Sequence, residues 1–288
     1  MGAPHAQRAI VTGANTGLGY RTALELARAG VGVILAVRSP ERGADAAERI
    51  IADVPAADLR VARLDLGDLV SVRSFVADEL DAGPLDLLVA NAGVMLVPRR
   101  EFTTDGFEMH MGVNHLGHYA LTVGLLPAFL AVPAPRVVVV SSLAHWRATK
   151  LDPSLSVAGK YSPMGAYGQS KLANLLFVAE LHRRYRSHGL QAVAAHPGWS
   201  ATELLERDDD PGFTTKLSRQ ATQILGSSPE AGARPQIFAA LDPSINGGEF
   251  IGPSFAVRGR PRPGPRSRAA RDEGNARWLW DISAEQTA

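Results

Sequence analysis

Tyr167 and Lys171 are the two residues of this sequence best suited to proton transfer. They are four positions apart, so in a helix both side chains project from the same face. A lysine ammonium beside a phenol is expected to favour ionisation and to lower the phenol pKa from its ordinary value of about 10. A tyrosine tuned in this way can give a proton to a carbonyl oxygen or take one from an alcohol. Because the spacing also arises by chance, its meaning depends on what the fold places around it.

Other polar and glycine residues follow apolar runs of the chain, each where a strand is expected to end. In open α/β sheets, ligands bind beyond the carboxyl ends of the strands. We therefore expect these residues to line one edge of a sheet. They are Gly13 to Gly19, Arg38, Asp65, Asn91 to Gly93, Ser142, and Pro197 with Gly198.

The elements that must position these residues alternate along the chain. Short apolar runs predict strands over residues 8–12, 31–37, 60–64, 85–90, 137–140, 190–195 and 248–251. Helical periods predict a helix that ends near Gly30 and further helices over residues 40–53, 68–80, 105–130, 165–186, 213–225 and 229–241.

This alternation predicts an α/β fold with a doubly wound parallel sheet of about seven strands and helices on both faces. We expect a single domain over residues 1–288. Residues 199–245 are expected to supply substrate-lid helices before the last strand. Residues 253–270, whose basic part is 258–268, are rich in Pro, Gly and Arg and are expected to form a surface loop.

The turn from Gly13 to Gly19 lies between a predicted strand and a predicted helix. Small residues let the backbone approach a pyrophosphate, and the helix N-terminus adds N–H donors and a positive dipole. Arg38 follows the second strand, where a carboxylate would hold the ribose hydroxyls of NAD. An arginine at that place suits the 2′-phosphate of NADP. The sequence therefore predicts NADP(H) in preference to NAD(H).

Composition argues against several other functions. A net charge of +1 gives no indication of a nucleic-acid partner. The absence of cysteine excludes disulfides and thiol nucleophiles, and the histidines lack the spacing of a zinc site, so no metal is expected. No signal peptide or apolar run of about 18 residues is found. We expect a soluble, cytoplasmic protein without a membrane anchor, and its oligomeric state, including a homo-oligomer, stays open.

Taken in chain order, these motifs resemble those of the short-chain dehydrogenase/reductase family. The matches are Thr12 to Gly19, Asn91 to Gly93, Asn114, Ser142 and the pair Tyr167 and Lys171. Finer matches are similar to its retinol dehydrogenase-like branch: Asn114 to His118, Ser141 to His145, Tyr167 to Asn174, His196 to Gly198, and Leu279 to Ser283. The resemblance covers nearly the whole chain and implies a Rossmann-type fold.

The resemblance also implies roles for individual residues. Ser142 would hydrogen-bond the substrate oxygen, Tyr167 would act as general acid and base, and Lys171 would hold the nicotinamide ribose. Asn114 would bend its helix and hold a water that passes protons to Lys171. Asp65 and Leu66 would contact the adenine ring, and Pro197, Gly198 and Thr202 would lie against the nicotinamide and its phosphate. The complete expected cofactor set is Gly13, Asn15, Thr16, Gly17, Leu18, Gly19, Arg38, Asp65, Leu66, Asn91, Ala92, Gly93, Tyr167, Lys171, Pro197, Gly198 and Thr202.

These expectations favour an NADP(H)-dependent alcohol dehydrogenase or carbonyl reductase that acts on a mainly apolar small molecule. Two alternatives belong to other classes. A non-catalytic NADP(H)-binding regulator would need only the cofactor-binding part of the pattern. An epimerase or dehydratase could use the same proton-transfer residues, but such relatives usually carry a larger C-terminal substrate domain than the chain after Gly198 provides.

Overall fold

The structure is a computed structural model that describes residues 7–156, 159–198, 228–255 and 259–288. Its strands join one sheet in the order β3-β2-β1-β4-β5-β6-β7-β8, in which β1 to β7 run parallel and β8 runs antiparallel to β7. The strands are β1 (Arg8–Thr12), β2 (Gly32–Val37), β3 (Leu59–Arg63), β4 (Leu87–Ala90), β5 (Arg136–Val140), β6 (Gln191–Ala195), β7 (Phe250–Pro253) and β8 (Pro261–Pro263). The predicted parallel α/β sheet is confirmed.

Alternate side chains of the central strands enter two separate cores. On β1, Ile10 packs into one core, while Ala9 and Val11 pack into the other. On β5, Val138 joins the core of Val11, and its neighbours Val137 and Val139 join that of Ile10. Both faces of the sheet are therefore buried, which explains the unbroken apolar runs in the sequence.

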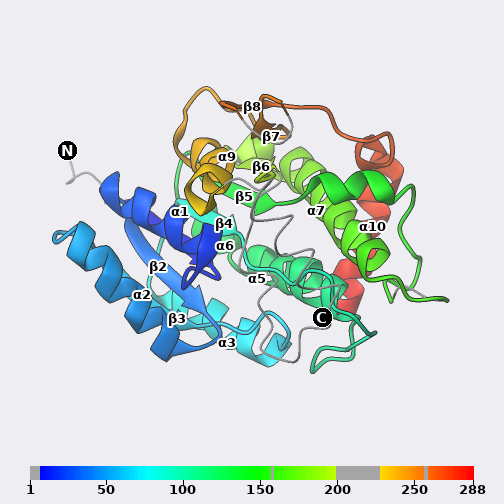
Figure 1. The fold of residues 1–288 in the computed structure, drawn as a ribbon, viewed down its shortest axis with the longest axis horizontal. Helices are drawn as coiled ribbons and strands as arrows, with labels where there is room; N and C mark the ends of the chain where they lie inside the picture. The colour runs from blue at the N-terminus through cyan, green and yellow to red at the C-terminus, as the bar shows by residue number, and fades with distance from the viewer. Residues whose placement is uncertain (1–6, 157–158, 199–227, 256–258) are drawn as a thin grey trace.

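Helices cover both faces of the sheet (Figure 1). One face carries α1 (Gly17–Arg28), α2 (Pro40–Asp53) and α9 (Pro229–Leu241). The other carries α3 (Leu69–Asp81), α5 (Gly117–Gly124) and α7 (Pro163–Tyr185). The last helix, α10 (Glu273–Thr287), packs on α7, where Trp280 stacks on Phe177 with ring centroids 5.9 Å apart. This contact anchors the C-terminal helix to the body of the protein.

Residues 105–130, predicted as one helix, form a helix that begins later and changes its pitch. The segments are α4 (Met109–Met111), a π-helical turn η1 (Gly112–Leu116), α5, and α6 (Leu126–Phe129). The start is delayed because a β-bridge between Phe102 and Glu108 closes a turn in front of it. The Glu108 carboxylate then caps the helix by accepting a hydrogen bond from the N–H of Met111 at 2.9 Å. The π turn places one extra residue in the ladder at Asn114, where a bend was expected.

The segment 253–270, predicted as a loop, contains the short strand β8. Its residues Pro261 and Pro263 have no N–H, and such residues are confined to the edges of sheets. β8 lies at that edge and pairs with β7 alone. Within the predicted lid, α9 confirms the helix over residues 229–241, whereas residues 199–227 lie outside the described residues. In the part of the chain that is described, none of the helices has the length and apolar character needed to cross a membrane.

Candidate functional site

The residues predicted to act together gather at one edge of the sheet. Neighbouring parallel strands end side by side, so the loops that follow them meet. The order at this edge is Asp65 after β3, Arg38 after β2, Gly13 after β1, Asn91 after β4, Ser142 after β5, and Pro197 after β6. Thr202 lies outside the described residues.

The glycine-rich turn Gly13 to Gly19 brings the start of α1 close to the end of β1. Gly13 and Gly17 have φ angles of 65° and 54°, which favour glycine. A Cβ on Gly19 would overlap the carbonyl oxygen of Gly13. The first turn of α1, which follows Thr16, contains no acidic side chain. The helix N-terminus therefore offers backbone N–H groups and an uncompensated dipole to a phosphate.

Two residues outside the motif hold this turn in shape. The Arg49 guanidinium lies over the ring of Tyr20, 4.4 Å from its centroid, and donates to the carbonyl oxygen of Asn15 at 3.1 Å. Leu18 is buried beneath the turn. The sequence pattern did not identify Arg49, because it lies on α2, a separate helix whose periodicity does not reveal this contact.

Thr12 joins the end of β1 to the end of β4. Its hydroxyl oxygen accepts hydrogen bonds from the backbone N–H groups of Asn91 and Ala92, each at 2.9 Å. The Asn91 side chain donates to the carbonyl oxygen of Thr12 at 2.9 Å and accepts from Gln236 at 3.0 Å. The polar side chain of Asn91 is thus occupied in bracing the sheet edge, and its backbone is the part available to a ligand.

The residues after β2 and β3 differ in how many hydrogen bonds and ion pairs they make within the protein. Arg38 is exposed, and among the described residues it has no ion pair or side-chain hydrogen bond. One carboxylate oxygen of Asp65 accepts from the N–H of Gly67 at 2.9 Å and so shapes the local turn. Leu66 is buried, and its backbone lies so close to Gly117 that a Cβ there would overlap the Leu66 carbonyl oxygen. Of the predicted cofactor residues after β2 and β3, Arg38 is therefore the one whose side-chain donors are not engaged by the described residues.

Ser142, Tyr167 and Lys171 converge where β5 ends and α7 begins. The Ser142 side chain lies close enough to the Tyr167 phenol to act on its pKa. The Lys171 Nζ lies 5.5 Å from the centroid of the Tyr167 ring and donates to the carbonyl oxygen of Val140 at 3.0 Å. Lys171 is 4% exposed, so its ammonium group lies in an environment of low polarity. A hydroxyl, a phenol and a cation are therefore brought together as predicted.

The protonation state of the phenol differs from the prediction. Burial raises the pKa of Tyr167 to about 12, and the nearby Ser142 side chain only partly opposes this rise. Burial lowers the pKa of Lys171 to about 8. The prediction that the lysine lowers the phenol pKa is wrong for this structure, because desolvation dominates. Tyr167 is therefore protonated at neutral pH.

Asn114 connects this cluster to the loop after β4. Its Oδ1 accepts from the N–H of Val94 at 2.7 Å, while its Nδ2 donates to the Val94 carbonyl oxygen at 3.0 Å and to the Ser170 hydroxyl at 2.9 Å. A Cβ on Gly93 would lie 2.9 Å from Asn114 Oδ1 and 3.6 Å from Lys171 Nζ. The backbone at Gly93 thus lies directly against Asn114 and Lys171.

His118 links the end of β1 to Asn114. Its Nε2 lies 2.9 Å from the hydroxyl of Thr12, and its Nδ1 lies 3.2 Å from the carbonyl oxygen of Asn114. Since the Thr12 oxygen already accepts two N–H groups, its own proton points to Nε2, and the imidazole proton is on Nδ1. Burial lowers the pKa of His118 to about 4, consistent with a neutral ring. Its position four residues after Asn114 was the available signal in the sequence.

The turn after β6 is held by His196. Gly198, with φ of 75°, donates its N–H to His196 Nδ1 at 3.1 Å. Pro197 lies between them and is half-buried. No group of three or more histidines and carboxylates within the described ranges has the arrangement of a metal site.

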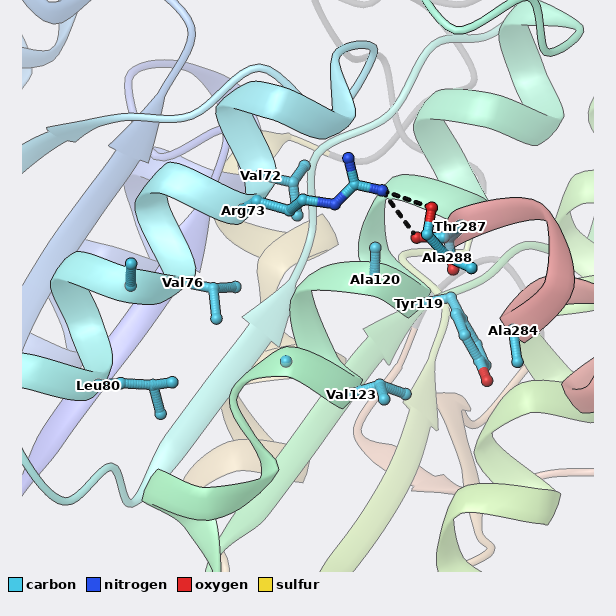
Figure 2. A pocket seen from close by; sticks show the side chains of 12 residues that line it. Val72, Arg73, Val76, Leu80, Tyr119, Ala120, Val123, Ala284, Thr287 and Ala288 are labelled. Carbon is cyan, nitrogen blue, oxygen red and sulfur yellow. Dashed lines mark hydrogen bonds between the residues drawn. The ribbon is translucent and has the colours of Figure 1, made fainter.

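A separate groove of about 390 Å³ lies between α3, α5 and the end of α10. Figure 2 shows Val72 and Val76 on α3 facing Val123 on α5, with Arg73 donating to the carbonyl oxygen of Ala288 at 2.7 Å. None of the predicted site residues lines this groove. The candidate site is therefore the strand-end edge and not this groove.

Comparisons with known proteins agree with this arrangement. A family model described as short chain dehydrogenase matches residues 7–211. Human retinol dehydrogenase 13 is 40% identical over 279 residues, which cover 96% of this chain and 82% of the relative. Mouse polyprenol dehydrogenase is 41% identical over 283 residues, which cover 94% of this chain and 81% of the relative. A crystal structure of a protein from Mycobacterium paratuberculosis is similar with a TM-score of 0.79 and 41% identity, covering 98% of this chain and 93% of that one.

Proposed function

This chain belongs to the short-chain dehydrogenase family and is an oxidoreductase, and we propose that it transfers hydride between NADP(H) and a mainly apolar alcohol or carbonyl compound. The nicotinamide supplies or accepts the hydride, so the protein must position two molecules and manage one proton and one charged oxygen. The observation that carries the proposal is the convergence of Ser142, Tyr167 and Lys171 beside the glycine-rich turn.

Tyr167 is the proposed general acid in carbonyl reduction. A phenol is protonated at neutral pH even at its ordinary pKa of about 10, and burial raises the pKa of Tyr167 further, to about 12. The Ser142 hydroxyl lies near that phenol, so a substrate oxygen placed between them can accept from both groups. This combines acid catalysis with stabilisation of the developing negative charge. In alcohol oxidation the same tyrosine takes the proton back.

Lys171 is the proposed source of positive charge and the contact for the nicotinamide ribose. Its ammonium is buried next to the phenol and already donates one hydrogen bond to Val140. An ammonium has three donors, so two stay available to a ribose hydroxyl or a water. A cation at this place favours the phenolate that forms when Tyr167 gives up its proton. We assign Asn114 the role of holding the loop after β4 against this lysine.

The preference for NADP(H) rests on Arg38. Its guanidinium is exposed at the carboxyl end of β2 and, among the described residues, is not engaged in an ion pair. Arg63, also exposed, is paired in register with Val37, so a second positive charge stands at the same edge. Guanidinium groups bind phosphate through paired, charge-assisted hydrogen bonds. A 2′-phosphate would therefore be favoured over two free hydroxyls.

The proposed substrate class comes from the relatives. Retinol and polyprenol, named in two of them, are isoprenoid alcohols with a long apolar part and one hydroxyl. Such a molecule needs only one polar contact point, which Ser142 and Tyr167 can provide. We therefore propose that isoprenoid or similarly apolar alcohols and aldehydes are better substrates than sugars or charged metabolites.

The direct test is oxidation of NADPH in the presence of a panel of apolar aldehydes, ketones and quinones, with NADP⁺ and the matching alcohols for the reverse direction. We expect turnover with apolar carbonyl compounds and a higher kcat/KM for NADPH than for NADH. Tight binding of NADPH without turnover across the panel would instead identify a cofactor-binding regulator.

A further inference from the structure

His145 lies three residues after Ser142, on the 3₁₀ helix η2 (Leu143–Arg147). Ser142 is the N-cap of this helix, and its hydroxyl oxygen accepts from the N–H of Ala144 at 3.1 Å. The His145 Nδ1 lies 2.7 Å from the carbonyl oxygen of Ser142, and the backbone N–H of His145 donates to the same oxygen at 3.2 Å. Both the side chain and the backbone of Ser142 are therefore oriented by this one turn.

The other ring nitrogen of His145 reaches a distant part of the chain. The backbone N–H of Ser267 donates to His145 Nε2 at 3.2 Å. Ser267 is itself buried and caps the short helix η5 (Ala269–Arg271), accepting from the N–H of Ala270 at 3.2 Å. The imidazole thus connects the turn at Ser142 to the segment that leads from β8 to α10.

These two contacts determine which nitrogen of the His145 ring carries the proton. A carbonyl oxygen can only accept, so Nδ1 carries the proton, and a backbone N–H can only donate, so Nε2 is unprotonated. The ring is 0% exposed and packs edge-on against Phe250 of β7 with centroids 5.4 Å apart. A neutral imidazole in one tautomer satisfies both neighbours, and the other tautomer would satisfy neither.

We propose that His145 is a positioning residue for Ser142: its neutral Nδ1–H form fixes the serine at the end of β5 by bridging it to Ser267. This inference rests on the proposed function of Ser142. The two polar ring atoms are used by protein groups, so His145 acts through Ser142 and makes no contact with substrate. Removing the bridge leaves the serine in place but lets its hydroxyl move relative to Tyr167.

Three substitutions separate the two ring contacts. The amide nitrogen of asparagine can occupy the place of Nδ1, so His145→Asn keeps the bond to Ser142 and loses that to Ser267. The amide of glutamine reaches the place of Nε2, so His145→Gln can keep the bond to Ser267 and loses that to Ser142. His145→Phe keeps the ring and loses both bonds.

We expect His145→Phe and His145→Gln to lower kcat by about ten- to 100-fold, since small displacements of a reacting group have effects of that size. KM and the Kd of NADPH should change by less than about twofold, because the substrate and cofactor contacts stay. His145→Asn, which keeps the bond to Ser142 and breaks the bridge to Ser267, should lower kcat by a smaller but measurable factor. Equal kcat in all four proteins, or losses confined to KM and Kd, would overturn the proposal.

A double-mutant cycle distinguishes this inference from the proposed function. If His145 acts through Ser142, adding His145→Phe to Ser142→Ala should lower kcat no further. A Ser142→Ala protein with unchanged turnover would refute the role of the serine. A strong loss in Ser142→Ala together with an independent, additive loss from His145→Phe would refute only the role of the histidine.

The tautomer can be measured in the wild-type protein, without any risk of misfolding. Nitrogen-15 NMR can assign the His145 ring as the one whose signals disappear in His145→Asn. We expect that ring to carry its proton on Nδ1. A proton on Nε2 of that ring would contradict the bridge.

Discussion

The two sides of the strand-end edge are built by different means. On the cofactor side, from Gly13 to Gly93, shape is created by backbone: positive φ angles, a helix N-terminus and glycines that permit contact with main-chain oxygens. On the proposed catalytic side, formed by Asn114, Ser142, Tyr167 and Lys171, shape is created by side chains that are buried or half-buried, of which Asn114 and Lys171 are hydrogen-bonded to neighbouring groups.

This difference predicts different responses to mutation. On the cofactor side, the backbone conformation determines whether the cofactor fits. Substitutions there should therefore change the Kd of the cofactor. Side-chain networks in a poorly solvated environment have large desolvation effects, so substitutions there should act on kcat or on stability. The experiments below test that division, beginning with the largest expected effect.

Replacing Tyr167 by Phe removes the proposed proton donor and leaves the ring. We expect kcat to fall by about 10³-fold, within the range of general acid catalysis, while the Kd of NADPH changes little. Steady-state kinetics and cofactor titration measure both quantities. Tyr119→Phe is the matched control, because it removes a phenol from α5 outside the catalytic side and should leave turnover nearly unchanged. Retained turnover in Tyr167→Phe would rule out the proton-donor role.

Gly19→Ala tests the cofactor side by overlap with the Gly13 carbonyl oxygen. Overpacking of this kind costs about 1–3 kcal/mol, which corresponds to about a 5- to 150-fold weaker NADPH affinity if the turn deforms. Gly17→Ala is the control: among the described residues no atom lies within 4 Å of its added Cβ, and only the φ of 54° is unfavourable. We expect it to weaken binding by less. Isothermal titration measures the Kd of NADPH for both variants. Weaker binding by Gly17→Ala than by Gly19→Ala would show that dihedral strain, and not steric overlap, controls the shape of the turn.

Arg38→Asp should change which cofactor is used. Loss of a charge-assisted contact worth about 1.5–3 kcal/mol, together with the new carboxylate, should lower the NADPH/NADH ratio of kcat/KM by about ten- to 100-fold. The measurement is kcat/KM for both cofactors with one substrate. If the ratio is the same in the variant and the wild type, Arg38 does not read the 2′-phosphate.

The buried histidines should make folding sensitive to acid. Burial lowers the pKa of His115 to about 3 and the pKa values of His118 and His196 to about 4, from 6.5. Between pH 6.5 and about 4 the unfolded chain therefore binds more protons than the folded one, and the free energy of unfolding decreases as pH falls. Each histidine contributes up to about 1.4 kcal/mol per pH unit. Urea denaturation at pH 7.5, 6.5 and 5.5 tests this, and equal stability at all three would contradict it.

The sequence contained most of the cofactor side, because its features are local. Glycine spacing, an apolar strand and a following helix lie within one short stretch, so Gly13, Gly17 and Gly19 could be identified together. The parallel sheet also followed from the alternation of apolar runs. The strand β8 could not be expected, since a Pro-Arg-Pro segment has no strand pattern and pairs only because it reaches the exposed edge of β7.

On the proposed catalytic side, the sequence predicted which residues lie together but not the protonation behaviour of the phenol. Tyr167 and Lys171 are close as expected, yet the phenol pKa rises, because burial is a property of the assembled core and not of a spacing. The contacts of His118 with Thr12 and of His145 with Ser267 join residues more than 100 positions apart. No periodicity within either segment encodes such pairs.

The packing of α10 on α7 couples two segments that are far apart in the sequence. Phe177, on the helix that carries Tyr167, stacks on Trp280 of α10. Removal of α10 would therefore expose aromatic surface on the helix that holds Tyr167 and Lys171, although neither of these two residues belongs to α10.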